Sequence, residues 1–358
     1  MAYRIYQKRL LKSQKISQLK EACLGRVHTL TSDFRRKLFP ILDNRLKEYA
    51  GIARITAEIR KGEDKETKEK GLQNLKIQVF SMASTMIYAS TLLEIYLLAQ
   101  FTLLNRYFFL DVVHSKRTIS QALQERLLET TIPHFLDVGL PILFDKMLRV
   151  VSKVMASLPL AAQLSNAALL EHFNTIQLKF IKHEQDGMEH CFEEILLPME
   201  RGEPWEYRYT NTVLEEDKIQ LLINELRDII ESTSFVGLVD QYRIQCTKDL
   251  VLSLFSSAPS LILPTLLPAI CKAISALPSP EEGQCEASRE KFLRENFDGV
   301  LEEEDLVEEE RKASVMDMAA GMDMMRMFGT FQGGSDTPNL WPSDLSADLS
   351  AFMETQSQ

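Results

Sequence analysis

Glycine and proline are scarce in this chain, with 14 Gly and 13 Pro among 358 residues. All-β proteins need both residues at their many turns, so this scarcity argues against that class and against a chain that is disordered throughout. No alternating strand pattern bounded by hairpin turns occurs, and no internal repeat is visible. The composition therefore favours helices, in a chain long enough to bury a large core.

Cysteine is also rare. The five cysteines are far apart in the sequence, no two have C-x-x-C spacing, and their number is odd. This pattern predicts reduced thiols and not a disulfide framework. The five positions are Cys23, Cys191, Cys246, Cys271 and Cys285.

The motifs of common enzyme chemistry are missing too. The chain has no G-x-x-x-x-G-K-S/T or G-x-G-x-x-G phosphate loop and no G-x-S-x-G nucleophile motif. The segment 183–191 holds two histidines, but Gly187 interrupts it and the H-E-x-x-H spacing is absent. Met and aromatic residues in 79–110, which a ligand pocket could use, have the spacing of a helical core. We therefore predict no catalytic residue, no metal ligand and no cofactor, and a helical enzyme is the weakest alternative.

Charge is distributed unevenly. Residues 1–70 hold 18 Lys and Arg against 9 Asp and Glu, a net of +9, which leaves −19 for the remainder of a chain whose net charge is −10. A basic first segment fits contact with an anionic membrane surface or an acidic partner, and also fits ordinary solvated helix faces. Acidic residues alternate with the basic ones and no nucleic-acid motif occurs, so nucleic acid is not an expected partner. The first 15 residues lack the apolar stretch of a cleavable signal peptide.

The most apolar stretch lies in 72–110. From Val79 to Leu104 only Glu94 is charged. A run of this length could cross a bilayer, but a charge near its middle is costly in lipid, and Ser, Thr and Gln dilute it. We interpret 79–104 as the buried central helix of a bundle and keep a transmembrane span as the alternative.

Helical periodicity recurs along most of the chain. Pro40 predicts a kink or break in the first helical region, and 61–71 reads as a solvated loop or helix end. The prolines in 258–278 predict short packed helical turns, and 198–211 reads as a loop. Four further helices are expected over about 118–157, 160–183, 213–231 and 234–257.

The C-terminal residues change character. Residues 301–311 form an acidic run, 315–333 are rich in Met and Gly, and the end is rich in Ser and Asp. Too little apolar surface is present to offset the entropy of ordering, so we expect disorder. The predicted fold class is all-α: a single elongated bundle of long helices over 1–295, with a disordered tail over 296–358.

Four stretches, taken in order, resemble the family of peroxisomal biogenesis factor 3. They are LKIQVF at 75–80 leading to LLNRYFFLD at 103–111, a helix over 124–151 that contains GLPILF, LLINELRDIIES at 221–232, and the proline-broken segment 261–278. The resemblance covers about 72–278 and rests on the shared order and spacing of these stretches.

The resemblance implies a receptor on the cytosolic face of the peroxisomal membrane. Such a receptor contacts membrane lipids and binds an N-terminal amphipathic helix of a carrier, peroxisomal biogenesis factor 19, which delivers peroxisomal membrane proteins. It could also bind inheritance or autophagy adaptors. In physical terms this is recognition of a helix in an apolar groove. A helical scaffold with another partner is a further alternative.

The resemblance also assigns candidate partner-binding residues. Leu72 stands where the family commonly has a Trp anchor, and its neighbours in the groove would be Lys68, Leu75, Leu104 and Tyr107. Three features depart from the family pattern. The Trp is absent, Asn105-Arg106 replaces a Gly-Gly pair, and residues 1–30 contain no 18-residue apolar run that would serve as the family's membrane anchor.

Overall fold

The structure is a computed structural model that describes residues 2–62, 64–114, 119–185, 191–198, 213–256, 259–277 and 285–298. Nearly all of these residues are helical, which confirms the predicted all-α class. The helices are α1 Ala2–Ala50, α2 Ile52–Lys61, α3 Lys65–His114, α4 Gln121–His134, π-helix η1 Phe135–Gly139, α5 Leu140–Met155, α6 Asn166–Gln185, α7 Cys191–Leu196, α8 Val213–Glu231, α9 Thr233–Leu254, α10 Leu263–Ile274 and α11 Glu286–Asp298. Two short strands, β1 Gln163–Ser165 and β2 Ser260–Ile262, pair antiparallel with Leu164 opposite Leu261.

The chain divides into two compact units, 1–109 with 119–298, and 110–118 with 299–358. The first unit contains nearly all the described residues. Of the second unit the structure describes 110–114, the end of α3. The predicted tail begins within α11, which runs to Asp298, and the rest of it lies outside the described residues.

Helix α3 forms the centre of the first unit. Every residue from Val79 to Arg106 is buried. Aromatic pairs tie α3 to the helices around it: Phe101 meets Phe34 of α1, with ring centroids 5.0 Å apart, and Tyr88 meets Phe180 of α6 at the same separation. The interpretation of 79–104 as a buried central helix is thus what the packing shows.

Two helical segments are long and apolar enough to cross a membrane, namely Lys65–His114 and Gln121–Met155. The apolar window is 100% buried inside the protein in the first and 50% buried in the second. Lipid contact along 79–104 would require the surrounding helices to move away. The core helix of a helical bundle is buried in the same way and has the same length and composition. These two properties are therefore only weak evidence for a membrane span in this chain.

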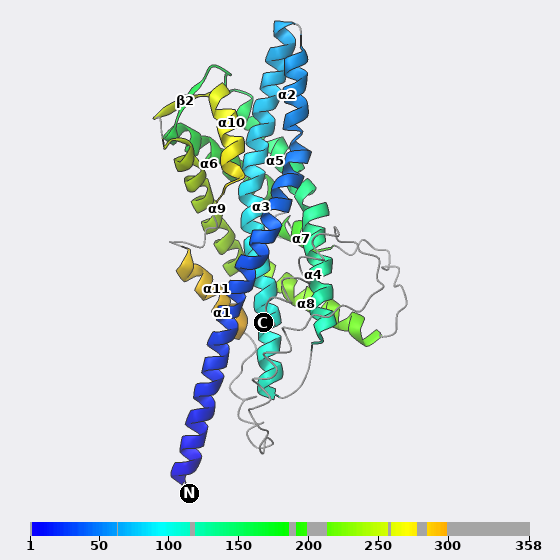
Figure 1. The fold of residues 1–358 in the computed structure, drawn as a ribbon, viewed down its shortest axis with the longest axis vertical. Helices are drawn as coiled ribbons and strands as arrows, with labels where there is room; N and C mark the ends of the chain where they lie inside the picture. The colour runs from blue at the N-terminus through cyan, green and yellow to red at the C-terminus, as the bar shows by residue number, and fades with distance from the viewer. Residues whose placement is uncertain are drawn as a thin grey trace. The chain divides into compact units, whose positions relative to one another are not determined.

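Helix α1 runs antiparallel to α3 along much of its length (Figure 1). It passes through Pro40 without a break, contrary to one reading of the sequence. Pro40 is exposed while Leu38 and Leu42 are buried, so the ring lies on the outer face. Water can solvate the carbonyl group that loses its hydrogen bond there, which lowers the cost of the proline.

The prolines after residue 258 also interrupt helical structure less than the sequence predicted. Residues 263–274 form one helix, α10, and not several short turns. Pro264 occupies the first turn, where a missing N–H costs nothing, and Pro268 faces solvent. Between Pro133 and Pro141 the π-helix η1 interrupts the α-helical pattern, so these prolines coincide with a local change of helix geometry. The helix predicted over 213–231 matches α8 at both ends.

The short helix α7 packs unusually close to η1. A methyl group added to Gly139 would lie 1.9 Å from the carbonyl oxygen of Ile195, so only glycine permits this approach. The Tyr96 hydroxyl donates a hydrogen bond of 2.7 Å to the Leu196 carbonyl, and Lys146 pairs with Glu194 at 3.1 Å. Burial raises the pKa of Tyr96, which keeps the phenol protonated as a donor. These contacts fix α7 against α3 and α5.

Candidate functional site

The candidate surface lies where α2 ends and α3 begins. Asp64 caps α3, accepting hydrogen bonds from the backbone N–H and the hydroxyl of Thr67, and these two bonds lower the pKa of its carboxyl. Gly71 lies against Ile59 of α2, with only 2.6 Å between a hypothetical methyl group and the Ile59 side chain. The two helices therefore meet closely, at the end of the molecule labelled α2 in Figure 1.

Three of the five predicted partner-binding residues lie together on this part of α3. Lys68 is exposed, and Leu72 and Leu75 are half-buried. Their spacing of i, i+4 and i+7 places them along one face of the helix. The result is a short apolar stripe, Leu72 and Leu75, with a cation at its outer end.

Lys76 follows this stripe directly and points the other way. Its side chain is fully buried and its ammonium group donates a 2.6 Å hydrogen bond to the carbonyl of Leu158, the residue that follows α5 by three positions. Burial lowers the pKa of Lys76. This hydrogen bond holds the first part of α3 against the residues that follow α5. It therefore fixes the position of the helix segment that carries the Leu72–Leu75 stripe. Nothing in the sequence distinguishes Lys76 from an exposed lysine.

The structure does not bring Leu104 and Tyr107 to this surface. Leu72 and Leu104 are 32 positions apart on one helix, which corresponds to about 48 Å. Leu104 is buried in the core. The hydroxyl of Tyr107 donates to Glu225 of α8, and burial, followed by Glu225, raises its pKa to about 12. The expectation of one groove with all five residues is therefore wrong, because 79–104 separates them.

The Asn105-Arg106 pair has a structural role of its own. Arg106 pairs with Glu225 and donates a 3.2 Å hydrogen bond to the carbonyl of Asn296 on α11. Asn105 donates to the Phe101 carbonyl at 2.9 Å. Arg106 and Tyr107 thus share Glu225 in an internal polar cluster that connects α3 with α8 and α11.

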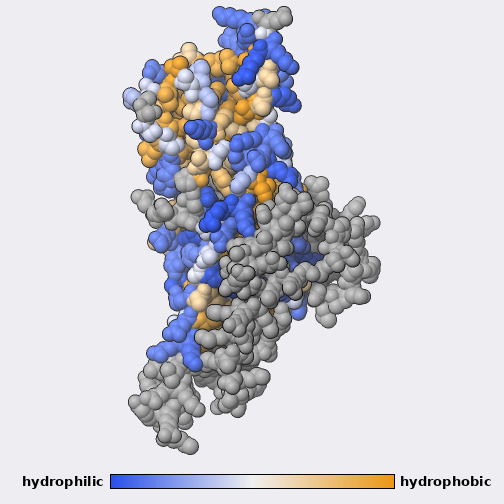
Figure 2. Space-filling view, in the orientation of Figure 1, coloured by the Kyte–Doolittle hydropathy of each residue, from blue (hydrophilic) through white to orange (hydrophobic). Residues whose placement is uncertain are grey.

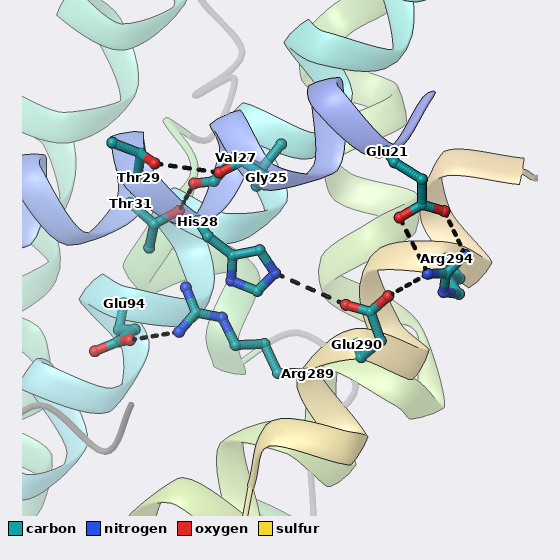
Figure 3. A network of polar contacts seen from close by, with 10 residues as sticks. All are labelled: Glu21, Gly25, Val27, His28, Thr29, Thr31, Glu94, Arg289, Glu290 and Arg294. Atoms are coloured by element: carbon teal, nitrogen blue, oxygen red, sulfur yellow. Dashed lines mark hydrogen bonds and ion pairs between the residues drawn. The ribbon is translucent and has the colours of Figure 1, made fainter. Parts of the chain in front are cut away.

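A second buried polar group surrounds Glu94 (Figure 3). Its carboxylate lies 2.9 Å from Arg35 of α1 and 3.7 Å from Arg289 of α11, and both Glu94 and Arg289 are almost fully buried. The next turn of α11 contacts α1 directly, since Arg294 pairs with Glu21 at 3.2 Å and Glu290 lies 3.8 Å from His28. If 79–104 crossed a membrane, Glu94 would be a charge within lipid; in the structure it is the counter-ion of two arginines inside the protein.

Figure 2 adds the distribution of apolar surface. Hydrophobic residues gather in the upper part of this face, over α10 and the neighbouring parts of α1 and α3, while the end of the α2–α3 pair is hydrophilic. Ile262 of β2 is 50% exposed, and Pro264 and Pro268 of α10 are exposed. The apolar surface of this face therefore lies over α10 and not at the end of the α2–α3 pair, where the helix that carries Leu72 and Leu75 begins.

Among the described residues, no group of three or more His, Cys, Asp or Glu could hold a metal ion. The four cysteines whose side chains are described, Cys23, Cys246, Cys271 and Cys285, form no disulfide. The side chains of the histidine cluster in 183–191, and residues 199–211 of the predicted loop, lie outside the described part of the structure.

Comparison with known protein families finds no family model that matches this chain, and comparison with curated proteins finds no matching sequence.

Proposed function

We propose that this chain is a docking receptor at the cytosolic face of the peroxisomal membrane for peroxisomal biogenesis factor 19, the carrier of newly made peroxisomal membrane proteins. The observation that carries the proposal is the Lys68, Leu72 and Leu75 stripe. It lies at the start of the helix that bears the resemblance to the peroxisomal biogenesis factor 3 family, and it presents half-buried leucines at the surface.

The recognition would follow from the chemistry of the stripe. An amphipathic helix laid across α3 would bury the exposed parts of Leu72 and Leu75 with its own apolar residues. A carboxylate on that helix would pair with Lys68 at the edge and orient it. Affinity would then depend mainly on the two leucines, because a partly exposed ion pair contributes little. Leu104 and Tyr107 are not part of the proposed surface.

The test is a titration of the purified chain with a fluorescent peptide of the carrier's N-terminal amphipathic helix. We expect saturable binding below about 100 µM, which corresponds to roughly −5.5 kcal/mol. Leu72→Asp should weaken it at least about tenfold, because a buried leucine is worth about 1.5–3 kcal/mol and a buried carboxylate costs more.

Leu221→Asp supplies the matched control. Leu221 is 51% exposed on α8, and Figure 1 places α8 well away from the start of α3. This variant should bind the peptide as the unmodified chain does. Equal losses in both variants, or no saturable binding in any, would count against the receptor function.

The membrane-embedded alternative makes a different prediction. If 79–104 spanned a bilayer, the purified chain would need detergent to stay monodisperse. The complete burial of the α3 window favours a chain that needs none. Sedimentation of the chain with and without detergent distinguishes the two, and aggregation relieved only by detergent would favour the span.

A further inference from the structure

Helix α10 is apolar on all sides. Among its 12 residues Lys272 is the only charged side chain and Thr265 the only hydroxyl. In the described part of the chain, every other helix of eight or more residues carries both acidic and basic residues. A helix that is apolar all round is expected to be buried all round. The structure buries one face of α10 and leaves the other in contact with solvent.

The two faces of α10 are separate in its helical geometry. The face packed into the protein is made of five buried residues, Leu263, Leu266, Leu267, Ile270 and Ile274. The outer face is made of four exposed residues and a half-buried alanine, namely Pro264, Thr265, Pro268, Lys272 and Ala269. At about 100° per residue, the outer five lie within an arc of about 140°, opposite the buried five. They therefore form one surface, over which Figure 2 shows hydrophobic residues gathered.

The strand pair continues this surface at the start of α10. Gln163 of β1 lies opposite Ile262 of β2, so their side chains share one side of the two-stranded sheet, and both are exposed. The N–H of Leu263 donates a 3.0 Å hydrogen bond to the carbonyl of Ala162. This bond places the residues just before β1, which include the exposed Ala161, beside the first turn of α10.

No carboxylate interrupts the two chain segments that meet here. Residues 154–170 contain no charged side chain, and Lys272 is the one charge in 250–280. Surfaces that bind proteins are enriched in Tyr, Trp, Phe, Met and Arg, and the exposed side chains of α10, β1 and β2 include none of these. An apolar face with one cation and no anion instead complements a lipid surface, in which phosphates lie above hydrocarbon.

We propose that the outer face of α10, together with Ile262, is a membrane contact surface whose occupant is the interfacial layer of a lipid bilayer. Helix α10 is about 18 Å long, too short to cross a hydrocarbon core of about 30 Å, so it would lie along the membrane. Its outer face would enter the first 5–10 Å or so of the bilayer, with Lys272 reaching a lipid phosphate. The inference does not rest on carrier binding, whose proposed residues lie on α3.

Flotation of the full chain with phosphatidylcholine vesicles tests the contact itself. We expect half of the chain to float at a lipid concentration on the order of 1 mM, since a few inserted side chains bind more weakly than one acyl chain. Flotation should persist at high salt, because the contact is mainly apolar. No flotation at about 10 mM lipid would overturn the proposal. Flotation that requires phosphatidylserine and is lost at high salt would assign the contact to the basic first segment and also overturn it.

Pro268→Glu tests the position of the surface, because it places a carboxylate on the outer face of α10. Pro268 is exposed inside the helix, so its replacement also removes a helix breaker, and loss of folding would not explain a loss of binding. Pro268→Glu and Ile262→Asp should each raise the lipid concentration needed for flotation about tenfold. The matched control is Leu221→Asp on α8, since Leu221 is 51% exposed and Ile262 50%. Flotation unchanged in the first two variants, or equally weakened in the control, would overturn the assignment.

An environment-sensitive dye tests insertion without adding a charge. The dye is attached through a maleimide to Thr265→Cys on the outer face or to Leu221→Cys on α8, and the unmodified chain, treated in parallel, corrects for native cysteines. Its fluorescence should rise severalfold with vesicles at Thr265→Cys and stay unchanged at Leu221→Cys. Equal responses at both positions would overturn the proposal. So would a chain that does not float but self-associates in sedimentation unless it carries Pro268→Glu, because a second copy of the chain would then cover this face.

Discussion

Replacing Glu94 by glutamine is the most direct test of how the first unit is held together. The substitution keeps the shape of the side chain and removes its charge. Glu94 is 1% exposed, and the two arginines beside it have side chains that are 12% and 6% exposed. Glu94→Gln would leave Arg35 and Arg289 as buried cations that have lost their common carboxylate.

The expected loss in the free energy of unfolding is large, because the buried charges of Arg35 and Arg289 would remain without their carboxylate partner. Removing one partner of a buried ion pair costs about 3–5 kcal/mol, whereas an exposed pair contributes about 0–1 kcal/mol. A domain of ordinary stability unfolds at about 5–15 kcal/mol, so the variant should lose a substantial share of its stability. Replacing all three residues by apolar ones, Glu94→Leu, Arg35→Met and Arg289→Met, should restore most of the loss, since no buried charge is left unpaired.

Urea unfolding followed by circular dichroism measures these free energies. Lys70→Gln is the control, because Lys70 and Glu66 pair at 2.6 Å with side chains 76% and 80% exposed. It should change the free energy of unfolding by less than about 0.5 kcal/mol. A loss below about 1 kcal/mol for Glu94→Gln would refute the reasoning, since it would mean that water reaches the Glu94 site.

Two further predictions concern packing and pH. Gly139→Ala should destabilise the chain by about 1–3 kcal/mol, because the added methyl group forces α7 away from η1. The control is Gly25→Ala, which has open space around it and should be neutral or stabilising. Equal effects of the two substitutions on the free energy of unfolding in urea would contradict this account of Gly139. Burial raises the pKa of Cys23 to about 11 and of Cys246 to about 12 from 9.0, so the folded chain keeps both thiols protonated while the unfolded chain ionises them. Stability should therefore fall as pH rises above 9, by about 1.4 kcal/mol per thiol between pH 8 and 10. The measurement is urea unfolding across this range, and the double variant Cys23→Ala with Cys246→Ala should fall less steeply; equal slopes would contradict the assignment.

Much of the helical architecture could be read from the sequence, because it depends on local periodicity. The hydrophobic residues of α8, which recur with helical periodicity, and the uninterrupted apolar run in α3 both specify their helices without knowledge of their neighbours. The strands β1 and β2 could not be found, since three residues are too few to show alternation. The effect of a proline also depends on its environment: Pro40 and Pro268 face solvent and are tolerated, while the Pro133–Pro141 region deforms into η1.

The candidate site was less predictable, for a geometric reason. Sequence motifs place residues in order but not in space, so Leu72 and Tyr107, which belong to one apolar segment, were expected in one groove. A straight helix of this length separates them. The partners of Glu94 were also invisible, because Arg35 and Arg289 lie far from it in sequence and resemble any other basic residue on a helix.

The position of α11 has a consequence for synthesis of the chain. Arg289 and Arg294 of α11 pair with Glu94 and Glu21, which leave the ribosome long before α11 does. Until residue 298 has emerged, Glu94 has one arginine instead of two, and the side of α1 and α3 that α11 covers is open to water or to chaperones. Contacts between such distant residues form late and slow the acquisition of the final structure. A stalled nascent chain whose emerged part ends before residue 286 should therefore be captured by chaperones more readily than one whose emerged part includes all of α11.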